Sequence, residues 1–359
     1  MEEHLVLKNI SKNFGEVEAV KDVSLSFKRG ELVTLLGPSG CGKTTTLHMI
    51  AGFHIPERGS IVLSGKEITF LPAYKRKTPM VFQEYALFPH LTIFENIAYG
   101  LKIQKKDGKY IKNKVENVLN QLGLPPLSDR FPNQLSGGQQ QRIALARALV
   151  LDPEVLLLDE PLSNLDAKLR IQVRYEIKEL QNRLKITMIY VTHDQEEALS
   201  ISDKVAVMNK GVVEQFGTPW EIYHRPKNEF VAGFVGETNF LPVTVTDLRK
   251  ETGNTVVEFI WRDRILSLPT NRTDLNKGSQ KTLLLRPEAI TLSKTLSTNV
   301  NNQYLPGTVK QRSFLGAITR YWIDIGNQEV VVDDSKTGEN GIYDNEVFRS
   351  FSGENTYFL

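Results

Sequence analysis

A glycine-rich loop near the N-terminus has the residue types that bind a phosphate. Residues 37–44 read Gly-Pro-Ser-Gly-Cys-Gly-Lys-Thr, which fits the pattern G-x-x-x-x-G-K-[ST]. Glycines let backbone N–H groups form an anion cradle, and a following helix N-terminus adds partial positive charge. In this pattern Lys43 reaches the terminal phosphates and the Thr44 hydroxyl coordinates Mg²⁺. The loop predicts a nucleotide site, in which Cys41 stands at a variable position that a small residue fits.

Two adjacent carboxylates follow an apolar run at 155–158. Asp159 is suited to holding Mg²⁺, directly or through water, because hard cations favour carboxylate oxygens. Glu160 is suited to act as the general base that polarises an attacking water. The alternative is a polar strand end that leads into a turn at Pro161. The phosphate loop in the same chain favours the chemical interpretation.

A third polar residue follows another apolar run, at 186–191. His193 comes directly after it in the sequence Val-Thr-His-Asp. In an open α/β sheet, ligands gather at the carboxyl ends of the strands, where the phosphate loop and the two carboxylates are also expected. We therefore expect His193 to sense the γ-phosphate, although one histidine after a buried strand is more often structural.

Composition limits the class of protein. The chain has 359 residues, 40% hydrophobic and 24% charged, which is ordinary for a soluble globular protein of two domains. Its net charge of +2 gives no general reason to expect nucleic acid as a partner. Cys41 is the single cysteine, so no internal disulfide can form. The first residues do not resemble a secretory signal, and no window reaches the roughly 18 apolar residues of a spanning helix. We expect a cytosolic chain whose membrane role, if any, comes through a partner.

The elements that must position these residues form an α/β pattern. Strands are expected at 4–8, 23–27, 31–36, 154–159 and 186–191, and helices at 44–51 and 167–184. A helix-favouring stretch covers about 95–150, with a break at Pro125-Pro126. Asn209-Lys210-Gly211 predicts a hairpin over 205–217, and Thr218-Pro219 predicts a helix start. Short β-rich segments follow, so we predict a boundary near 235–240, with one domain over 1–235 and a small β-barrel over 236–359.

The run Ser136-Gly137-Gly138-Gln139, together with the phosphate loop, the acidic strand end and His193, resembles the ATPase subunits of ABC transporters over about 1–235. The resemblance implies a P-loop NTPase core with an α-helical subdomain at 95–150. It also implies that ATP and Mg²⁺ are the ligands. The implied metal ligands are Thr44, Gln83 and Asp159, and the implied catalytic residues are Glu160, His193 and Gln83.

The resemblance also implies which residues contact the nucleotide. Phe14 resembles the aromatic residue that stacks on adenine, and Asp166 resembles the aspartate that crosses an interface between two subunits. Asn164 departs from the alanine that is usual two residues before that aspartate. The full set of implied nucleotide contacts is Phe14, Gly37, Pro38, Ser39, Gly40, Cys41, Gly42, Lys43, Thr44, Thr45, Ser136, Gly137, Gly138, Gln139 and Asp166.

By the same resemblance, the Ser-Gly-Gly-Gln element (residues 136–139) binds the γ-phosphate of an ATP held by another subunit. Since the chain has one phosphate loop and one such element, the active form is expected to be a homodimer with ATP between the two copies. The loop that starts at Gln83 is expected to face membrane permease subunits, and a substrate-binding protein acts indirectly. The chain would then lie at the cytoplasmic face of the membrane, with no nucleic acid as partner.

Further stretches resemble the importer ATPases of the sugar, polyamine and ferric-iron group. These are residues 85–92, residues 190–199, and the tail sequences Leu-Arg-Pro-Glu at 285–288 and Ser-Phe-Leu-Gly at 313–316. The tail resembles an oligonucleotide-fold-like (TOBE-type) regulatory domain, which either binds a ligand or only stabilises a dimer. Residues 71–76 and 201–203 favour polyamine or ferric iron as cargo. A sugar or phosphonate importer, a soluble ABC ATPase and a non-catalytic regulatory subunit remain the alternatives.

Overall fold

The computed structural model describes residues 3–124, 127–251, 254–262, 264–270, 275–293, 303–326, 328–335, 346–351 and 356–359. The predicted break at Pro125-Pro126 lies outside these residues. The chain divides into two compact units, Met1–Trp220 and Glu221–Leu359. This division falls earlier than the boundary predicted near 235–240.

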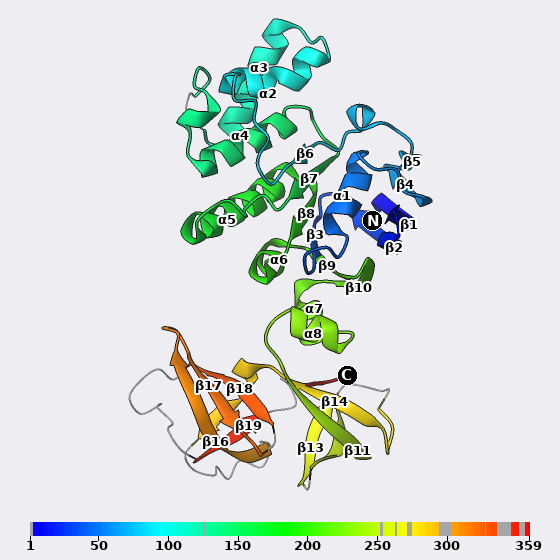
Figure 1. The fold of residues 1–359 in the computed structure, drawn as a ribbon, viewed down its shortest axis with the longest axis vertical. Coiled ribbons are helices and arrows are strands. Elements are labelled where there is room, and N and C mark those ends of the chain that lie inside the picture. The colour runs from blue at the N-terminus through cyan, green and yellow to red at the C-terminus, as the bar shows by residue number, and fades with distance from the viewer. Residues whose placement is uncertain are drawn as a thin grey trace. The chain divides into compact units, whose positions relative to one another are not determined.

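A six-stranded sheet forms the centre of the first unit (Figure 1). Its central strands are parallel and almost entirely buried, which explains why their sequences are continuous apolar runs without alternation. A hairpin closes one edge, with Lys210 and Gly211 both at positive φ in its turn. The strands, in sheet order, are β10 (Val212–Gly217), β9 (Lys204–Asn209), β3 (Leu32–Leu36), β8 (Thr187–Thr192), β7 (Val155–Asp159) and β6 (Met80–Val81).

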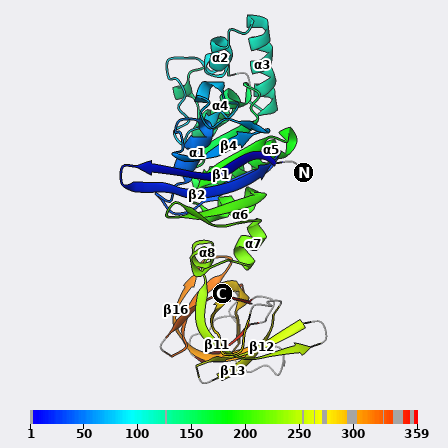
Figure 2. The same ribbon diagram turned by 90° about the vertical axis from the view of Figure 1, so that its right-hand side faces the viewer.

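A second, antiparallel sheet packs beside it through the helix α1 (Lys43–Ala51). Its order is β2 (Val17–Lys28), β1 (Glu3–Phe14), β4 (Arg58–Leu63) and β5 (Lys66–Glu67). The two N-terminal strands form the long hairpin seen in Figure 2. The sequence predicted only 4–8 and 23–27, because several register shifts interrupt the side-chain alternation in these 12-residue strands.

Three helices, α2 (Ile93–Ile103), α3 (Gly108–Gln121) and α4 (Gly137–Leu149), occupy the stretch expected at about 95–150. Each begins at a side chain that accepts hydrogen bonds from the first turn: Thr92, Asp107 and Ser136. Thr92 and Ser136 form full capping boxes with Glu95 and Gln139. These helices share a hydrophobic core with α5 (Ala167–Leu184) and the central sheet. The 3₁₀ turns η1 (Ala73–Lys75) and η2 (Pro132–Gln134) complete the connections.

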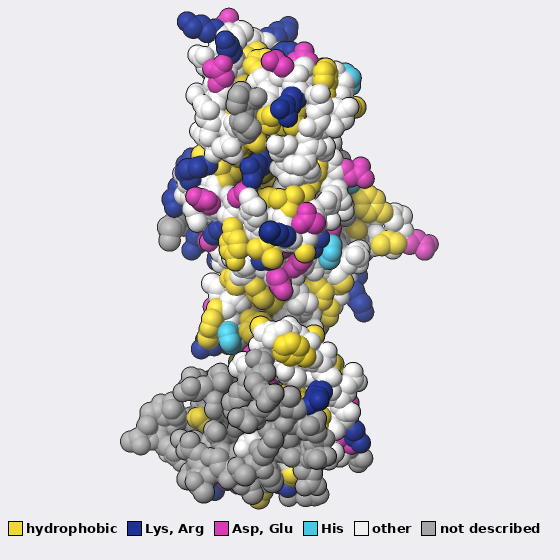
Figure 3. Space-filling model, turned by 90° about the vertical axis from the view of Figure 1, so that its left-hand side faces the viewer, with side chains coloured by type: hydrophobic (Ala, Val, Ile, Leu, Met, Phe, Trp, Pro, Cys, Tyr) yellow, Lys and Arg dark blue, Asp and Glu magenta, His cyan; other side chains and the backbone are white. Residues whose placement is uncertain are grey.

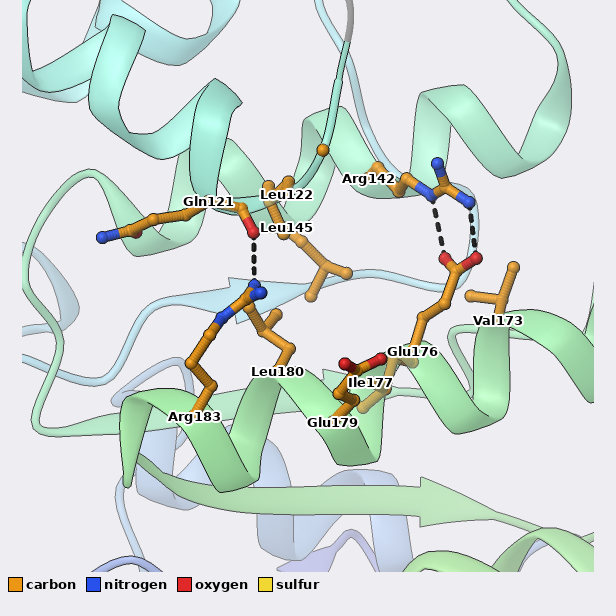
Figure 4. A pocket seen from close by; sticks show the side chains of 11 residues that line it. Gln121, Leu122, Arg142, Leu145, Val173, Glu176, Ile177, Glu179, Leu180 and Arg183 are labelled. Carbon is orange, nitrogen blue, oxygen red and sulfur yellow. Dashed lines mark hydrogen bonds and ion pairs between the residues drawn. The ribbon is translucent and has the colours of Figure 1, made fainter.

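Two side-chain bridges join this helical part to α5 around a cavity of about 220 Å³ (Figure 4). Arg142 on α4 donates from Nε and Nη2 to the Glu176 carboxylate, at 2.9 and 2.6 Å. Arg183, near the end of α5, donates to the carbonyl of Gln121 at the end of α3. Both of these polar contacts lie among the residues that line the cavity. The cavity is lined between them mainly by leucine and isoleucine side chains.

The second unit contains the remaining part of α7 (Pro219–His224), α8 (Glu229–Phe234), η3 (Pro287–Ala289) and two five-stranded sheets around one shared core. One sheet has the order β13 (Arg264–Thr270), β12 (Asn254–Trp261), β11 (Asn239–Glu251), β14 (Gln280–Leu285) and β20 (Thr356–Phe358). The other has the order β15 (Thr291–Ser293), β19 (Glu346–Phe351), β16 (Gln303–Phe314), β17 (Thr319–Asp324) and β18 (Glu329–Asp334). The sequence predicted one small barrel with β-rich segments at 241–245, 255–261, 282–285, 318–323 and 329–332, which correspond to five of these ten strands.

Arg286 explains why α8 and most of α7 belong with these sheets. This buried guanidinium donates to the carbonyls of Tyr223 and Ala232, both at 2.9 Å, and stands 4.1 Å from the centre of the Tyr223 ring. Tyr223 in turn donates to Glu288 at 2.5 Å. The Leu-Arg-Pro-Glu sequence singled out above is therefore the anchor between these helices and β14.

On the upper part of the face drawn in Figure 3, basic and acidic side chains lie interspersed. Within the described residues, no helix combines the length and the apolar character needed to cross a bilayer.

Candidate functional site

The phosphate loop connects β3 to the first residue of α1. Gly42 precedes the helix at φ 102°, and no side chain caps the first turn, so its N–H groups are free to face an anion. Lys43 is buried and donates from Nζ to the carbonyls of Gly37 (2.8 Å) and Pro38 (2.9 Å). A Cβ added to Gly37 would lie 2.3 Å from the Met208 carbonyl oxygen. At Gly37 and Gly42 the loop thus takes a backbone path that disfavours any residue with a side chain.

The remaining residues of the phosphate loop differ in their exposure to solvent. Ser39 and Gly40 are exposed, Thr45 is half-buried, and Cys41 is buried. Burial raises the pKa of the Cys41 thiol, although nearby Lys43 opposes the shift. The carbonyl of Cys41 also accepts from the Gly211 backbone N–H at 3.1 Å. The residue is therefore a small buried neutral group that packs the loop against the β9–β10 turn.

Thr44 and Asp159 meet between α1 and the end of β7. The Thr44 hydroxyl donates to Asp159 Oδ1 at 3.0 Å. Burial raises the pKa of Asp159, while the Thr44 hydrogen bond and nearby His48 partly offset this effect. A hydroxyl oxygen beside a carboxylate oxygen, next to a phosphate cradle, is a donor set that fits Mg²⁺. The predicted pair of metal ligands is thus brought together.

Glu160 and His193 also meet, at the ends of the neighbouring strands β7 and β8. His193 Nδ1 donates to Glu160 Oε2 at 3.2 Å in the tautomer that protonates Nδ1. Glu160 has φ 42°, an unfavourable backbone conformation for a residue with a side chain, and its N–H donates to the Val191 carbonyl at 3.0 Å. The glutamate side chain is 22% exposed and the histidine 60%. Both side chains therefore remain accessible to a ligand.

Gln83 and Phe14 lie at exposed positions. Gln83 follows β6, and its carbonyl accepts from Asn164 Nδ2 at 3.0 Å. The ring of Phe14, 47% exposed at the end of β1, packs edge-on against His54 with centroids 5.3 Å apart. Lys12 Nζ lies 5.6 Å from the centre of this ring. The exposed part of an aromatic ring can stack on a planar ligand.

The Ser-Gly-Gly-Gln element begins α4. Ser136 Oγ accepts from the Gln139 N–H at 3.4 Å, and Gln139 Oε1 accepts from the Ser136 N–H at 3.0 Å. A Cβ on Gly138 would lie 3.3 Å from Leu169, so the glycine permits close packing with α5. Asp166 caps α5 by accepting from the Leu169 N–H at 2.9 Å. In the described part of the chain, no hydrogen bond or ion pair joins these residues to the phosphate loop.

Other residues near the site gave no clear signal in the sequence. Tyr190 on β8 donates to buried Glu197 on α6 (Gln195–Ile201) at 2.9 Å. Glu197 also lines a cavity of about 70 Å³ with Glu160 and His193. The alternation of apolar residues in strands and their periodicity in helices could not identify a carboxylate that faces inward from a short helix. In the sequence, Asn164 was notable only because the family pattern usually has alanine at this position. Nothing predicted that it would contact Gln83.

Known proteins resemble this chain over most of its length. The ABC transporter family model matches residues 20–163, and the TOBE domain model matches residues 283–353. The "Fe(3+) ions import ATP-binding protein FbpC" of Rhizobium etli is 46% identical over 91% of this chain and 90% of its own length. The "Spermidine/putrescine import ATP-binding protein PotA" of Acetivibrio thermocellus is 48% identical over 84% of each chain.

Among solved structures, a dimeric post-hydrolysis state of an ATP-binding cassette with bound ADP and Pi matches with a TM-score of 0.53. It is 32% identical and covers 60% of this chain and 98% of its own. The two relatives align over 91% and 84% of this chain. This chain therefore belongs to the ATP-hydrolysing, ATP-binding subunits of ABC transporters, with a TOBE domain after the ATPase domain.

Proposed function

We propose that this chain energises an ABC importer for ferric iron or a polyamine, working as a homodimer at the cytoplasmic face of the membrane. The observation that carries the catalytic part is the contact between Glu160 and His193 at 3.2 Å, beside the Thr44–Asp159 pair. A base, an orienting histidine and a metal-binding pair beside one phosphate cradle supply the groups that one copy needs to contribute to ATP hydrolysis.

The roles follow from positions. The N–H groups of the phosphate loop and Lys43 bind the phosphates of ATP, and Phe14 stacks on the adenine. Glu160 accepts a proton from the water whose oxygen attacks the γ-phosphorus, and the bond to the ADP oxygen breaks. His193 orients Glu160 through Nδ1 and lies beside the γ-phosphate. Mg²⁺, held by Thr44, Asp159 and Gln83, would neutralise charge on the phosphate oxygens.

The second half of the site is proposed to come from a second copy. Ser136 is exposed at the N-terminus of α4, a location that favours an anion. The neighbouring Asp166 begins α5 and is also exposed. The dimeric state of the related cassette supports this arrangement. ATP would then close the dimer, and hydrolysis would release it.

The cargo and membrane partner are inferred from the relatives. One is named for import of Fe(3+) ions and another for spermidine and putrescine. Permease subunits are proposed to contact the loop that starts at Gln83. Cells that lack this chain should lose uptake of either labelled ferric iron or labelled spermidine, and the chain should restore it. Normal uptake of both compounds would contradict the cargo assignment.

Glu160→Gln tests the hydrolytic assignment. The amide keeps the size of the side chain but cannot accept the proton, so hydrolysis should fall by at least about 100-fold. ATP binding should persist, and ATP should trap a dimer visible by size-exclusion chromatography. Glu179→Gln, on an exposed face of α5, is the matched control and should hydrolyse ATP normally. Unchanged turnover in Glu160→Gln would remove Glu160 from its role.

A further inference from the structure

The loop of residues 83–88, which begins at Gln83, has an unfavourable backbone conformation. Tyr85 and Ala86 are consecutive non-glycine residues in the left-handed region, with φ values of 61° and 47°. Residues with a Cβ rarely adopt this conformation, and it persists where the surroundings hold it. The contacts that hold this loop therefore decide where Gln83 is placed.

One of these contacts comes from the helix that carries the Ser-Gly-Gly-Gln element. Arg147, in the last turn of α4, donates from Nη1 to the Ala86 carbonyl at 2.6 Å and from Nη2 to the Tyr85 carbonyl at 2.8 Å. Its guanidinium also lies 5.6 Å from the centre of the Phe88 ring. A planar fork can hold two neighbouring carbonyls at once, which a lysine ammonium cannot do with the same geometry. The two left-handed residues are thus fastened to α4.

A second contact comes from the loop that leads to Asp166. Asn164 Nδ2 donates to the Gln83 carbonyl at 3.0 Å. The same loop is tied to the catalytic strand end, because Ser163 Oγ donates to the Glu160 carbonyl at 3.0 Å. Asn164 thus joins the start of the 83–88 loop to the segment between Glu160 and Asp166.

The far end of the loop is fixed separately. Asn96 on α2 is fully buried, and its amide accepts from the Phe88 N–H at 2.8 Å and donates to the Phe88 carbonyl at 3.1 Å. With Phe88 anchored, a movement of Arg147 or Asn164 has to be absorbed between residues 83 and 87. This is the segment that contains Gln83 and both left-handed residues.

We propose that Arg147 and Asn164 are positioning residues for Gln83. They link its location to the helix that begins at Ser136 and to the loop that ends at Asp166. This inference rests on the role proposed above for Gln83. A shift of either element changes the position of Gln83, so the exposed half of the site is coupled to the side chain assigned to Mg²⁺ and the attacking water.

The test uses Arg147→Lys and Asn164→Ala in the full chain, each alone and combined with Gln83→Ala. Each removes one or two hydrogen bonds, so kcat should fall, and the Mg²⁺ concentration for half-maximal hydrolysis should rise, by about three- to ten-fold. The KM for ATP and the Tm should change little. In the Gln83→Ala background the further loss should vanish, since both side chains act through Gln83.

Hydrogen exchange of nucleotide-free protein gives a second readout. Amides of residues 83–88 should exchange faster in Arg147→Lys and Asn164→Ala. Matched controls are Arg142→Lys, which lies on the same helix but pairs with Glu176, and Asn120→Ala on an exposed face of α3. Both controls should leave the exchange of this loop and the Mg²⁺ dependence unchanged.

The outcomes separate the two proposals. If Gln83→Ala hydrolyses ATP normally, the role proposed for Gln83 fails, and this inference fails with it. If Gln83→Ala is impaired but the Mg²⁺ dependence of Arg147→Lys and Asn164→Ala is that of the unmodified chain, only this inference is overturned. A loss that persists in full in the Gln83→Ala background would likewise show that the two side chains act elsewhere.

Discussion

The two halves of the candidate site are built in different ways. The half around Lys43 stands on buried parallel strands, and its side chains already contact one another: Thr44 with Asp159, and Glu160 with His193. The half around Ser136 stands at an exposed helix N-terminus, and its side chains are occupied in capping their own helix. One half is preorganised by burial, and the other by local hydrogen bonds that need no partner.

This difference fits the dimer proposed above, in which the half around Ser136 of one copy would complete the site of the other. The cap uses Ser136 Oγ as an acceptor, so its hydroxyl proton stays available to a phosphate oxygen. Gly137 and Gly138 bring the start of α4 close to α5 without covering its N-terminus. The exposed half therefore presents donors toward an anion without a penalty for leaving them unpaired inside the chain.

Lys43→Ala should have the largest effect, because it removes the cation from the buried half of the site, the half around Lys43. Loss of a buried charge-assisted contact to phosphate should weaken ATP binding by at least about 100-fold. Titration with a fluorescent ATP analogue measures this directly. Lys66→Ala, on an exposed strand, is the matched control and should bind like the unmodified chain. If Lys43→Ala kept its affinity, the phosphate loop would not be the nucleotide site.

Ser136→Arg should separate the two halves. The buried half is untouched, so monomeric protein should still bind ATP. A large cation at the start of α4 should prevent dimer closure and lower hydrolysis by at least about ten-fold, the effect of losing roughly 1.4 kcal/mol of closure energy. Light scattering with ATP reports the dimer.

Ser136→Ala controls for the lost cap, which alone costs about 1 kcal/mol of stability. Its dimer should still form, since the alanine leaves the N-terminus of α4 open. ATP-dependent dimers of Ser136→Arg would show that the exposed half does not face a second copy.

The same difference decides what the sequence could predict. Buried parallel strands leave continuous apolar runs, so β3, β7 and β8 were predicted within a residue or two, and the polar residues at their ends followed. The Ser-x-x-Gln spacing at Ser136 is also a capping box, and the prediction from the sequence did not use it. The resemblance to ABC ATPases had instead assigned these residues to the binding of a γ-phosphate.

Contacts between distant segments left no trace in the sequence. Nothing in residues 83–88 predicts two left-handed backbones, since neither Tyr85 nor Ala86 is a residue type that favours them. The Asn164 contact with Gln83 depends on how β6 and β7 pair. In the second unit, the strands that were missed include β15 and β20, which have only three residues each and are therefore too short for a period.

Glu197→Gln should have the smallest effect. It tests whether burial of side chains, rather than charge pairing, holds the half of the site around Lys43 in place. Burial raises the pKa of Glu197 above its ordinary value, and nearby Asp194 adds to this, while Thr192, Tyr190 and Arg170 oppose it. The folded state therefore favours the protonated acid. Its contribution to stability is complete below the ordinary pKa of about 4.3 and is lost as pH rises through the raised value.

The amide in Glu197→Gln stays neutral and can still accept from Tyr190. Its Tm relative to the unmodified, nucleotide-free chain should therefore rise as the pH increases above about 4.5, and the difference should level off once the Glu197 carboxyl of the unmodified chain has ionised. Glu196→Gln is the control, because its side chain is 84% exposed, and its Tm difference should stay flat with pH. A constant or falling difference for Glu197→Gln would mean that the carboxylate is stabilised in the folded state. Charge pairing, as well as burial, would then hold the half of the site around Lys43 in place.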